Sequence, residues 1–120
     1  MLEGYLIFIK SSKLLYLEIA SGINEKIIGL MYRKTLRQDS GMLFIYDDYN
    51  VRSLWMRNTY IPLDILFIRD NKIVDIKENN KILSDDPIVS DKKCNFVLEV
   101  NSNYVKKNNI NIGDYINIVL

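Results

Sequence analysis

The stretch DILFIRDNKIVDIKE, residues Asp64–Glu78, reads as two short strands joined by a tight turn. Ile, Leu, Phe and Val dominate both halves, and these residues favour extended backbone. Asp70 and Asn71 stand between the halves and suit the turn, because their side chains tolerate left-handed backbone and bond to nearby amides. This stretch therefore predicts a β-hairpin, and similar apolar runs elsewhere in the chain decide the fold class.

Five further runs of this kind are bounded by Asn, Asp, Ser or Gly, which is typical of short strands. In order along the chain, the runs are Tyr5–Ile9, Leu14–Ala20, Met42–Tyr46, Phe96–Val100 and Tyr115–Leu120. The first two of these are expected to form a second hairpin. We therefore expect a mainly β fold, a compact antiparallel barrel or sandwich that hides its sheet edges.

Two segments favour a helix. From Asn24 to about Lys34, Ile27 and Met31 fall on one face at the i, i+4 spacing of an amphipathic helix. A second short helix is expected from Ser102 to about Asn108, with Ser102 as its N-cap. One or two short α-helices should therefore cover the sheet.

The composition is that of one soluble globular domain spanning residues 1–120, with 48% hydrophobic and 26% charged residues. No apolar run approaches the roughly 20 residues of a membrane-spanning helix. The net charge of +1 argues against nucleic-acid binding. A cytoplasmic location is expected if Met1 is the native start, and the cell envelope or export if a leader has been removed.

The absence of histidine narrows the chemistry. With His 0, Ser-His-Asp and Cys-His nucleophilic sites and histidine-based zinc sites are excluded. The one cysteine, Cys94, cannot close an internal disulfide and is expected to pack as a small apolar residue. The sequence predicts no metal site and no cofactor.

The segment SLWMRNTYIPLDILF, residues Ser53–Phe67, combines aromatic, polar and charged side chains. Alternation along an extended strand would put one set on each side, namely Trp55, Arg57 and Thr59 against Met56, Asn58 and Tyr60. A bend is expected at Pro62, which cannot donate a ladder hydrogen bond. Trp55 is either a stacking surface for a ligand or a core side chain.

Three acids each lie inside an apolar run: Glu18, Asp64 and Glu99. A carboxylate buried alone is very costly, so each must be hydrogen-bonded, paired or neutralised. On a functional interpretation, Asp64 and Glu99 converge in a polar pocket as an acid/base pair. On a structural interpretation, each accepts backbone or arginine hydrogen bonds, and Glu18 lies on a solvated strand face.

Arg33, at the end of the first expected helix, has two interpretations. A cation there complements the helix dipole. Alternatively, its guanidinium makes a bidentate contact with Asp64, Glu99 or an anionic ligand.

The chain resembles the bacterial and archaeal family called domain of unknown function 192 in the order of its blocks, which are LEIA, GLMYRKTL, GMLFIY, WMRNTYIPLDILFI, VLEV and GDYI. The resemblance runs from about Leu15 to Ile116 and implies a compact, mostly β barrel or sandwich. It implies no activity, and many members follow a leader or lipid-anchor segment. The family's signature polar positions correspond to Arg33, Asn58, Thr59, Asp64 and Glu99.

Three functional hypotheses remain open. The first is a non-catalytic binding module for a small polar ligand, such as a carbohydrate, or for a protein partner; it rests on Arg33, Trp55, Asn58 and Asp64. The second is a hydrolase that uses Asp64 and Glu99 as catalytic carboxylates. The third is a structural or interaction accessory without a pocket. A monomer is favoured overall, whereas the third hypothesis predicts an exposed apolar patch or a stable oligomer.

Overall fold

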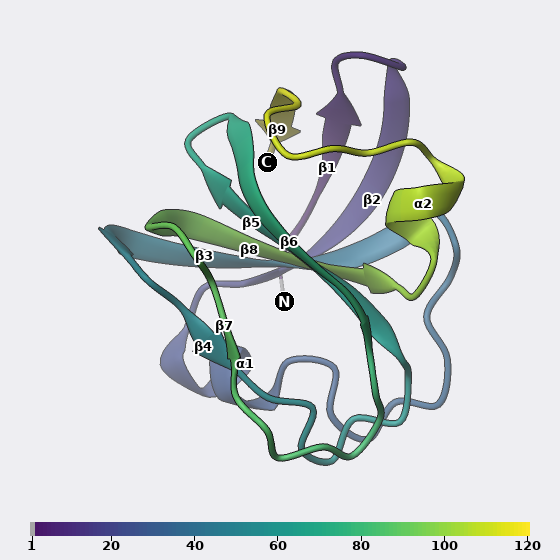
Figure 1. Cartoon of the computed structure of the whole chain (residues 1–120), viewed down its shortest axis with the longest axis vertical. Helices are drawn as coiled ribbons and strands as arrows, with labels where there is room; N and C mark the ends of the chain where they lie inside the picture. The colour runs from purple at the N-terminus through teal and green to yellow at the C-terminus, as the bar shows by residue number, and fades with distance from the viewer. Residues whose placement is uncertain (1) are drawn as a thin grey trace.

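The computed structural model describes residues 2–120 and consists mainly of β-strands (Figure 1). Its elements are β1 Leu2–Phe8, β2 Lys13–Ala20, α1 Ile23–Ile28, β3 Ser40–Asn50, β4 Ser53–Leu54, β5 Leu63–Arg69, β6 Lys72–Asn80, β7 Ile88–Val89, β8 Cys94–Asn101, α2 Tyr104–Lys107 and β9 Ile116–Val119. Seven strands form one sheet in the order β6-β5-β8-β3-β2-β1-β9, and β4 and β7 form a small second sheet. The predicted mainly β class with short helices is confirmed.

Both predicted hairpins are present, as β1 with β2 and β5 with β6. One pairing departs from the antiparallel expectation, because β2 and β3 are parallel. A tight turn cannot join parallel neighbours, so the chain needs a longer crossover. Residues 21–39 form this crossover and carry α1.

The large sheet curls into a partial barrel whose two edge strands meet at one end. There the amide of Ile73 donates to the carbonyl of Asp114 over 2.9 Å, and the amide of Gly113 donates to the carbonyl of Ile73 over 2.7 Å. A third bond runs from the amide of Ile116 to the carbonyl of Asn71 over 2.8 Å. These contacts cover part of the edges that β6 and β9 would otherwise expose.

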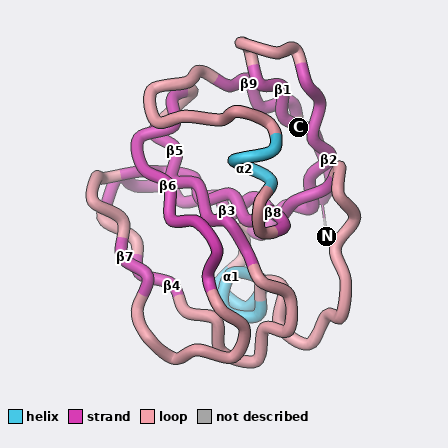
Figure 2. Tube along the Cα trace, turned by 45° about the vertical axis from the view of Figure 1, so that its right-hand side comes forward, coloured by secondary structure: helices cyan, strands magenta, loops and turns pink. Residues whose placement is uncertain are grey.

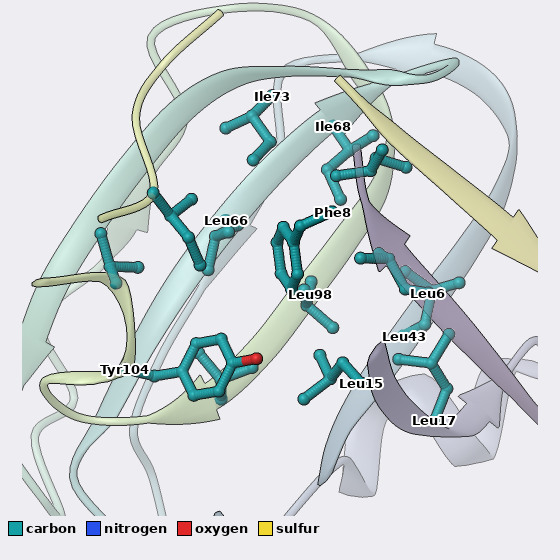
Figure 3. Close-up of a cluster of buried hydrophobic side chains, with 14 of the residues drawn as sticks. Leu6, Phe8, Leu15, Leu17, Leu43, Leu66, Ile68, Ile73, Leu98 and Tyr104 are labelled. Atoms are coloured by element: carbon teal, nitrogen blue, oxygen red, sulfur yellow. The ribbon is translucent and has the colours of Figure 1, made fainter. Parts of the chain in front are cut away.

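Each face of the curled sheet packs against its own apolar core. The inner core fills the barrel and includes Leu6, Phe8, Leu15, Leu66, Leu98 and Tyr104 (Figure 3). The outer core lies on the other face and includes Leu30, Met42, Phe44, Met56, Ile65, Phe67 and Val97. Since both faces are covered, the central strand β5 is a continuous apolar run rather than an alternating one.

Helix α1 is shorter than the sequence predicted. It ends at Ile28, because Gly29 adopts φ 49° and ψ −125°, a conformation that excludes residues with a side chain. The predicted helical face of Ile27 and Met31 therefore does not form, and Ile27 is exposed. Figure 2 shows α1 and α2 at separate places on the sheet. Neither helix in residues 2–120 is long and apolar enough to cross a membrane.

Helix α2 forms close to its predicted position, with a different cap. Its N-cap is Asn103 rather than Ser102, and Asn103 has φ 74° and makes no side-chain capping bond. The side chains of Tyr104 and Val105 are buried against the inner core. Packing of the apolar pair therefore holds this single turn in place, since so short a helix is not stable alone.

The segment 53–62 is not the extended strand that the sequence predicted. Only Ser53–Leu54 are in a strand, and Asn58 adopts a left-handed φ of 52° within a turn. Met56 and Thr59 are consequently both buried, although alternation assigned them to opposite sides. Turn geometry overrides the period-two pattern here because side-chain polarity alone does not fix the backbone.

Candidate functional site

A cavity of about 450 Å³ lies on the outer face of the sheet, bordered by α1 and by the loops that precede β5 and β7. Its walls are largely apolar, with Ile27, Ile28, Leu30, Met31, Phe44, Leu54 and Pro87 among the lining residues. The polar and aromatic side chains that line it are Lys26, Tyr46, Ser53, Trp55, Thr59, Asp85 and Glu99. The volume falls in the range of small-molecule sites, roughly 300–1,000 Å³.

Glu99 reaches the cavity from the middle of the sheet. It belongs to β8, where its register neighbours are Met42 on β3 and Ile65 on β5, both members of the outer core. Gly29 covers it from the crossover, since a Cβ added at Gly29 would lie 3.8 Å from Oε1 of Glu99 and 3.1 Å from the ring of Phe44. A glycine at this position leaves room for the carboxyl group to border open space.

The carboxyl group of Glu99 is buried among apolar neighbours without a partner. Its residue is only 5% exposed, and within residues 2–120 it has no hydrogen bond or ion pair that meets ordinary distance limits. Burial raises its pKa from 4.5 to about 8, because the charged form loses its hydration. Glu99 is therefore mainly protonated at neutral pH when the cavity holds no ligand.

Asp64 lies on the opposite face of the sheet and has a structural role. Its Oδ1 accepts the amide of Asn79 over 2.8 Å, and its Oδ2 accepts the amide of Val105 over 3.0 Å. It is fully buried among inner-core residues of β5 and β8, whereas Glu99 borders the outer core. The two acids cannot act on one substrate, so the predicted acid/base pair does not form.

Arg33 pairs with Glu18 rather than with either predicted acid. The guanidinium binds both carboxylate oxygens of Glu18, with Nη2 at 2.9 Å from Oε1 and Nη1 on Oε2. Glu18 and Glu99 both neighbour Met42 in the register, so they share one row on the outer face. This pair attaches the crossover to β2 and leaves Glu99 without a cation.

Trp55 and Thr59 line the cavity, and Asn58 lies outside it. The guanidinium of Arg57 stacks 3.8 Å from the centroid of the Trp55 ring and donates through Nε to Asp85 over 2.9 Å. The Thr59 hydroxyl is buried and donates to the carbonyl of Arg57 over 3.0 Å. Asn58 instead donates through Nδ2 to the Tyr32 hydroxyl over 3.0 Å, and so supports the crossover.

Sequence reasoning thus found three of the cavity residues, Trp55, Thr59 and Glu99, and missed most of the wall. Lys26 and Ile28 lie within the predicted helix from Asn24 to about Lys34, and Phe44 lies within the predicted strand Met42–Tyr46, so the pattern indicates no site at these positions. The signal that could have located the wall is Gly29, which interrupts the helix beside two isoleucines. Across residues 2–120, no group of three or more acidic or cysteine side chains is arranged to hold a metal ion.

Comparison with known proteins places the chain in a family. The model of the family described as "Uncharacterized ACR", domain of unknown function 192, matches residues 7–118. The chain belongs to this family. No curated protein matches the chain significantly. The resemblance inferred from the sequence blocks is therefore confirmed, and the family description assigns no activity.

Two crystal structures share the fold. One is a protein from Sinorhizobium meliloti 1021 described as a candidate transcription regulator, with 36% identity and a TM-score of 0.88 over 97% of this chain and 92% of that one. The other is a protein of unknown function from Novosphingobium aromaticivorans DSM 12444, with 28% identity and a TM-score of 0.89 over 97% of this chain and 84% of that one.

Proposed function

We propose that this chain is a non-catalytic binding module whose outer-face cavity holds a small ligand. The observation that carries the proposal is Glu99, a buried carboxyl group that has no partner among residues 2–120 and borders a cavity of about 450 Å³. Buried polar groups are nearly always hydrogen-bonded, so an unpaired one that faces open space is expected to be satisfied by a bound molecule.

The lining favours a ligand with an apolar body and few polar groups. Most wall residues are aliphatic or aromatic, and the hydroxyl of Thr59 already has a partner. A carbohydrate carries hydroxyl groups on most of its carbons, and each one buried without a partner costs free energy. Trp55 also has one ring face occupied by Arg57. These features support an amphiphilic small molecule over a sugar.

We do not extend the description of the Sinorhizobium relative as a candidate transcription regulator to this chain. Helices α1 and α2 contain six and four residues, which is short for an element that reads a DNA groove. The net charge of +1 also provides little attraction to a phosphate backbone.

The test is a fragment screen by two-dimensional NMR, which follows the Trp55 indole and the amides that border the cavity. We expect binders to shift these signals in the parent. The variant Ile28→Trp should abolish binding, because Ile28 lines the cavity and a larger side chain fills it. Ile23→Trp is the matched control, since Ile23 is on the same helix, is 78% exposed and does not line the cavity. A screen without binders, or binders indifferent to Ile28→Trp, would refute the proposal.

A further inference from the structure

Within residues 2–120, none of the cations near the cavity pairs with the Glu99 carboxyl group. Arg33 is bound by Glu18, and Arg57 by Asp85. Lys26, the only ammonium in the lining, donates to the carbonyl of Ile45 over 2.7 Å and lies 4.5 Å from the centroid of the Tyr46 ring. Each of these cations is held by another group, so the Glu99 carboxyl group is open to a cation that a ligand carries.

The residue type at position 99 also favours a charged ligand. Glutamine has nearly the same shape as glutamate and offers both a hydrogen-bond donor and an acceptor without charge. A neutral ligand can hydrogen-bond to glutamine, and burying glutamine costs much less desolvation free energy than burying a carboxylate. What the carboxyl group adds is a negative charge, and that charge stabilises only a cation.

The walls indicate what such a cation is attached to. The residues that line the cavity with Glu99 are mainly aliphatic and aromatic, so the lining suits a hydrocarbon stem or ring. Among the lining residues, the Trp55 ring and the Asp85 carboxylate hold the guanidinium of Arg57. Since Arg57 occupies this ring face and this carboxylate, the carboxyl group in the lining that is left for a ligand's cation is that of Glu99.

On the basis of the proposed function, we propose that the cavity selects an organic cation, a primary ammonium on an apolar stem that places its charge against the Glu99 carboxylate. Binding then releases one proton. The protonated Glu99 loses its proton to solvent, the ligand keeps its ammonium proton, and an ion pair replaces a neutral buried acid.

The proton release sets the pH dependence. Because the pKa of Glu99 in the empty cavity is about 8, the ammonium should bind more tightly as pH rises toward 8. The other charged or titratable groups near this site are on elements packed against Glu99, line the cavity or contact its lining. They are Glu18 of β2, Lys26 of α1, Arg33 of the crossover, Tyr46 of β3, Arg52 and Arg57 of the loops on either side of β4, and Asp85 of the loop before β7. Burial raises the pKa of Tyr46, so its hydroxyl stays neutral in this range.

The test compares 2-phenylethylamine with 2-phenylethanol, which has the same stem without the charge, by NMR titration at pH 6 and pH 8. Aliphatic amines stay protonated at both values, since their pKa is about 10. We expect the amine to bind up to about fiftyfold more tightly at pH 8 than at pH 6, following ionisation of Glu99. The alcohol should bind weakly and gain nothing at pH 8.

Two variants separate charge from shape. Glu99→Gln should abolish the pH dependence and most of the affinity for the amine while leaving binding of the alcohol intact. Lys26→Met should strengthen binding of the amine and leave the alcohol unchanged, because it removes a nearby positive charge. If the alcohol binds as well as the amine, or the amine binds less well at pH 8, the cavity takes a neutral ligand and this inference is wrong, while the proposed function stands. If neither probe nor any fragment of the screen binds, both fail.

Discussion

At the scale of the residue, Glu99 is the position where local stability and ligand binding conflict. Leu98 and Val100 on either side of it face the inner core, so strand alternation directs the carboxyl group into the outer core. Its apolar neighbours there, Met42 and Ile65, offer no hydrogen bond. Buried ionisable groups that destabilise the fold and make no stabilising contact are typical of binding sites.

The first prediction concerns the pH dependence of stability. The pKa of Glu99 is raised from 4.5 to about 8, so the folded chain holds this proton more tightly than the unfolded chain. Below about pH 4.5, Glu99 is protonated in both states and does not change the free energy of unfolding. As pH rises from there to about 8, Glu99 lowers the free energy of unfolding increasingly, because only the unfolded chain ionises freely. Urea titrations should show Glu99→Gln equal to the parent at pH 4 and more stable by up to about 3 kcal/mol at pH 7.

Glu3→Gln is the control for that comparison. Glu3 occupies the same row of the sheet, beside Glu18, but is exposed to solvent. The free energy of unfolding of Glu3→Gln should depend on pH in the same way as that of the parent. A Glu99→Gln variant that follows the parent profile from pH 4 to pH 9 would show that Glu99 is ionised at no cost in the empty cavity.

At the scale of the element, Asp64 connects three pieces of structure that are distant in sequence. It stands on β5, accepts the amide of Asn79 near the end of β6, and accepts the amide of Val105 in α2. Asn79 has φ 56°, so its amide is turned out of the regular ladder and needs another acceptor. The carboxylate thus holds a strand irregularity and a single helical turn against the barrel.

The second prediction follows from this geometry. Asp64→Asn replaces one acceptor oxygen with an amide group that points its own hydrogens at a backbone N–H. We expect a loss of about 2–4 kcal/mol in the free energy of unfolding, measured by urea titration at neutral pH. Asp47→Asn, at an exposed position of β3, is the control and should change stability by less than about 0.5 kcal/mol. A change in Asp64→Asn as small as in the control would contradict the structural role.

At the scale of the whole molecule, the curled sheet creates two environments from one set of strands. The concave face encloses the inner core, while the convex face depends on the crossover and the long loops to cover it. Those loops cover the convex face incompletely, and the cavity lies where they leave the sheet beside Glu99. Barrel closure therefore determines stability, and loop packing determines the site.

The third prediction tests the closure. Strand β9 pairs with β1 and meets the start of β6, and its Ile116 is 2% exposed in the inner core. Deletion of residues 116–120 should lower the free energy of unfolding by at least about 3 kcal/mol, because it removes buried apolar surface and opens the barrel edge. Deletion of Leu120 alone is the control, since Leu120 is 72% exposed. Similar urea midpoints for the two truncations would mean that the barrel does not depend on β9.

Much of the fold could be predicted from the sequence because its signals are local. Apolar runs fixed the strands β1, β2, β3, β5, β6, β8 and β9, and Asp70 marked the turn of the β5–β6 hairpin, where its φ is 57°. Two predictions failed at places where local signals compete. The helix from Asn24 stopped at Gly29, and the extended segment around Trp55 became a turn, because backbone conformation outweighed side-chain pattern.

The sequence by itself determined the β architecture, the lack of histidine chemistry, and the fact that Asp64 and Glu99 each lie within an apolar strand. Only the tertiary structure decided what each acid does. Strand register assigns neighbouring positions to opposite faces, and the faces acquire different surroundings only when the sheet curls and the loops pack. Asp64 thereby meets two backbone amides, whereas Glu99 meets a cavity, and no local sequence signal distinguishes these two outcomes.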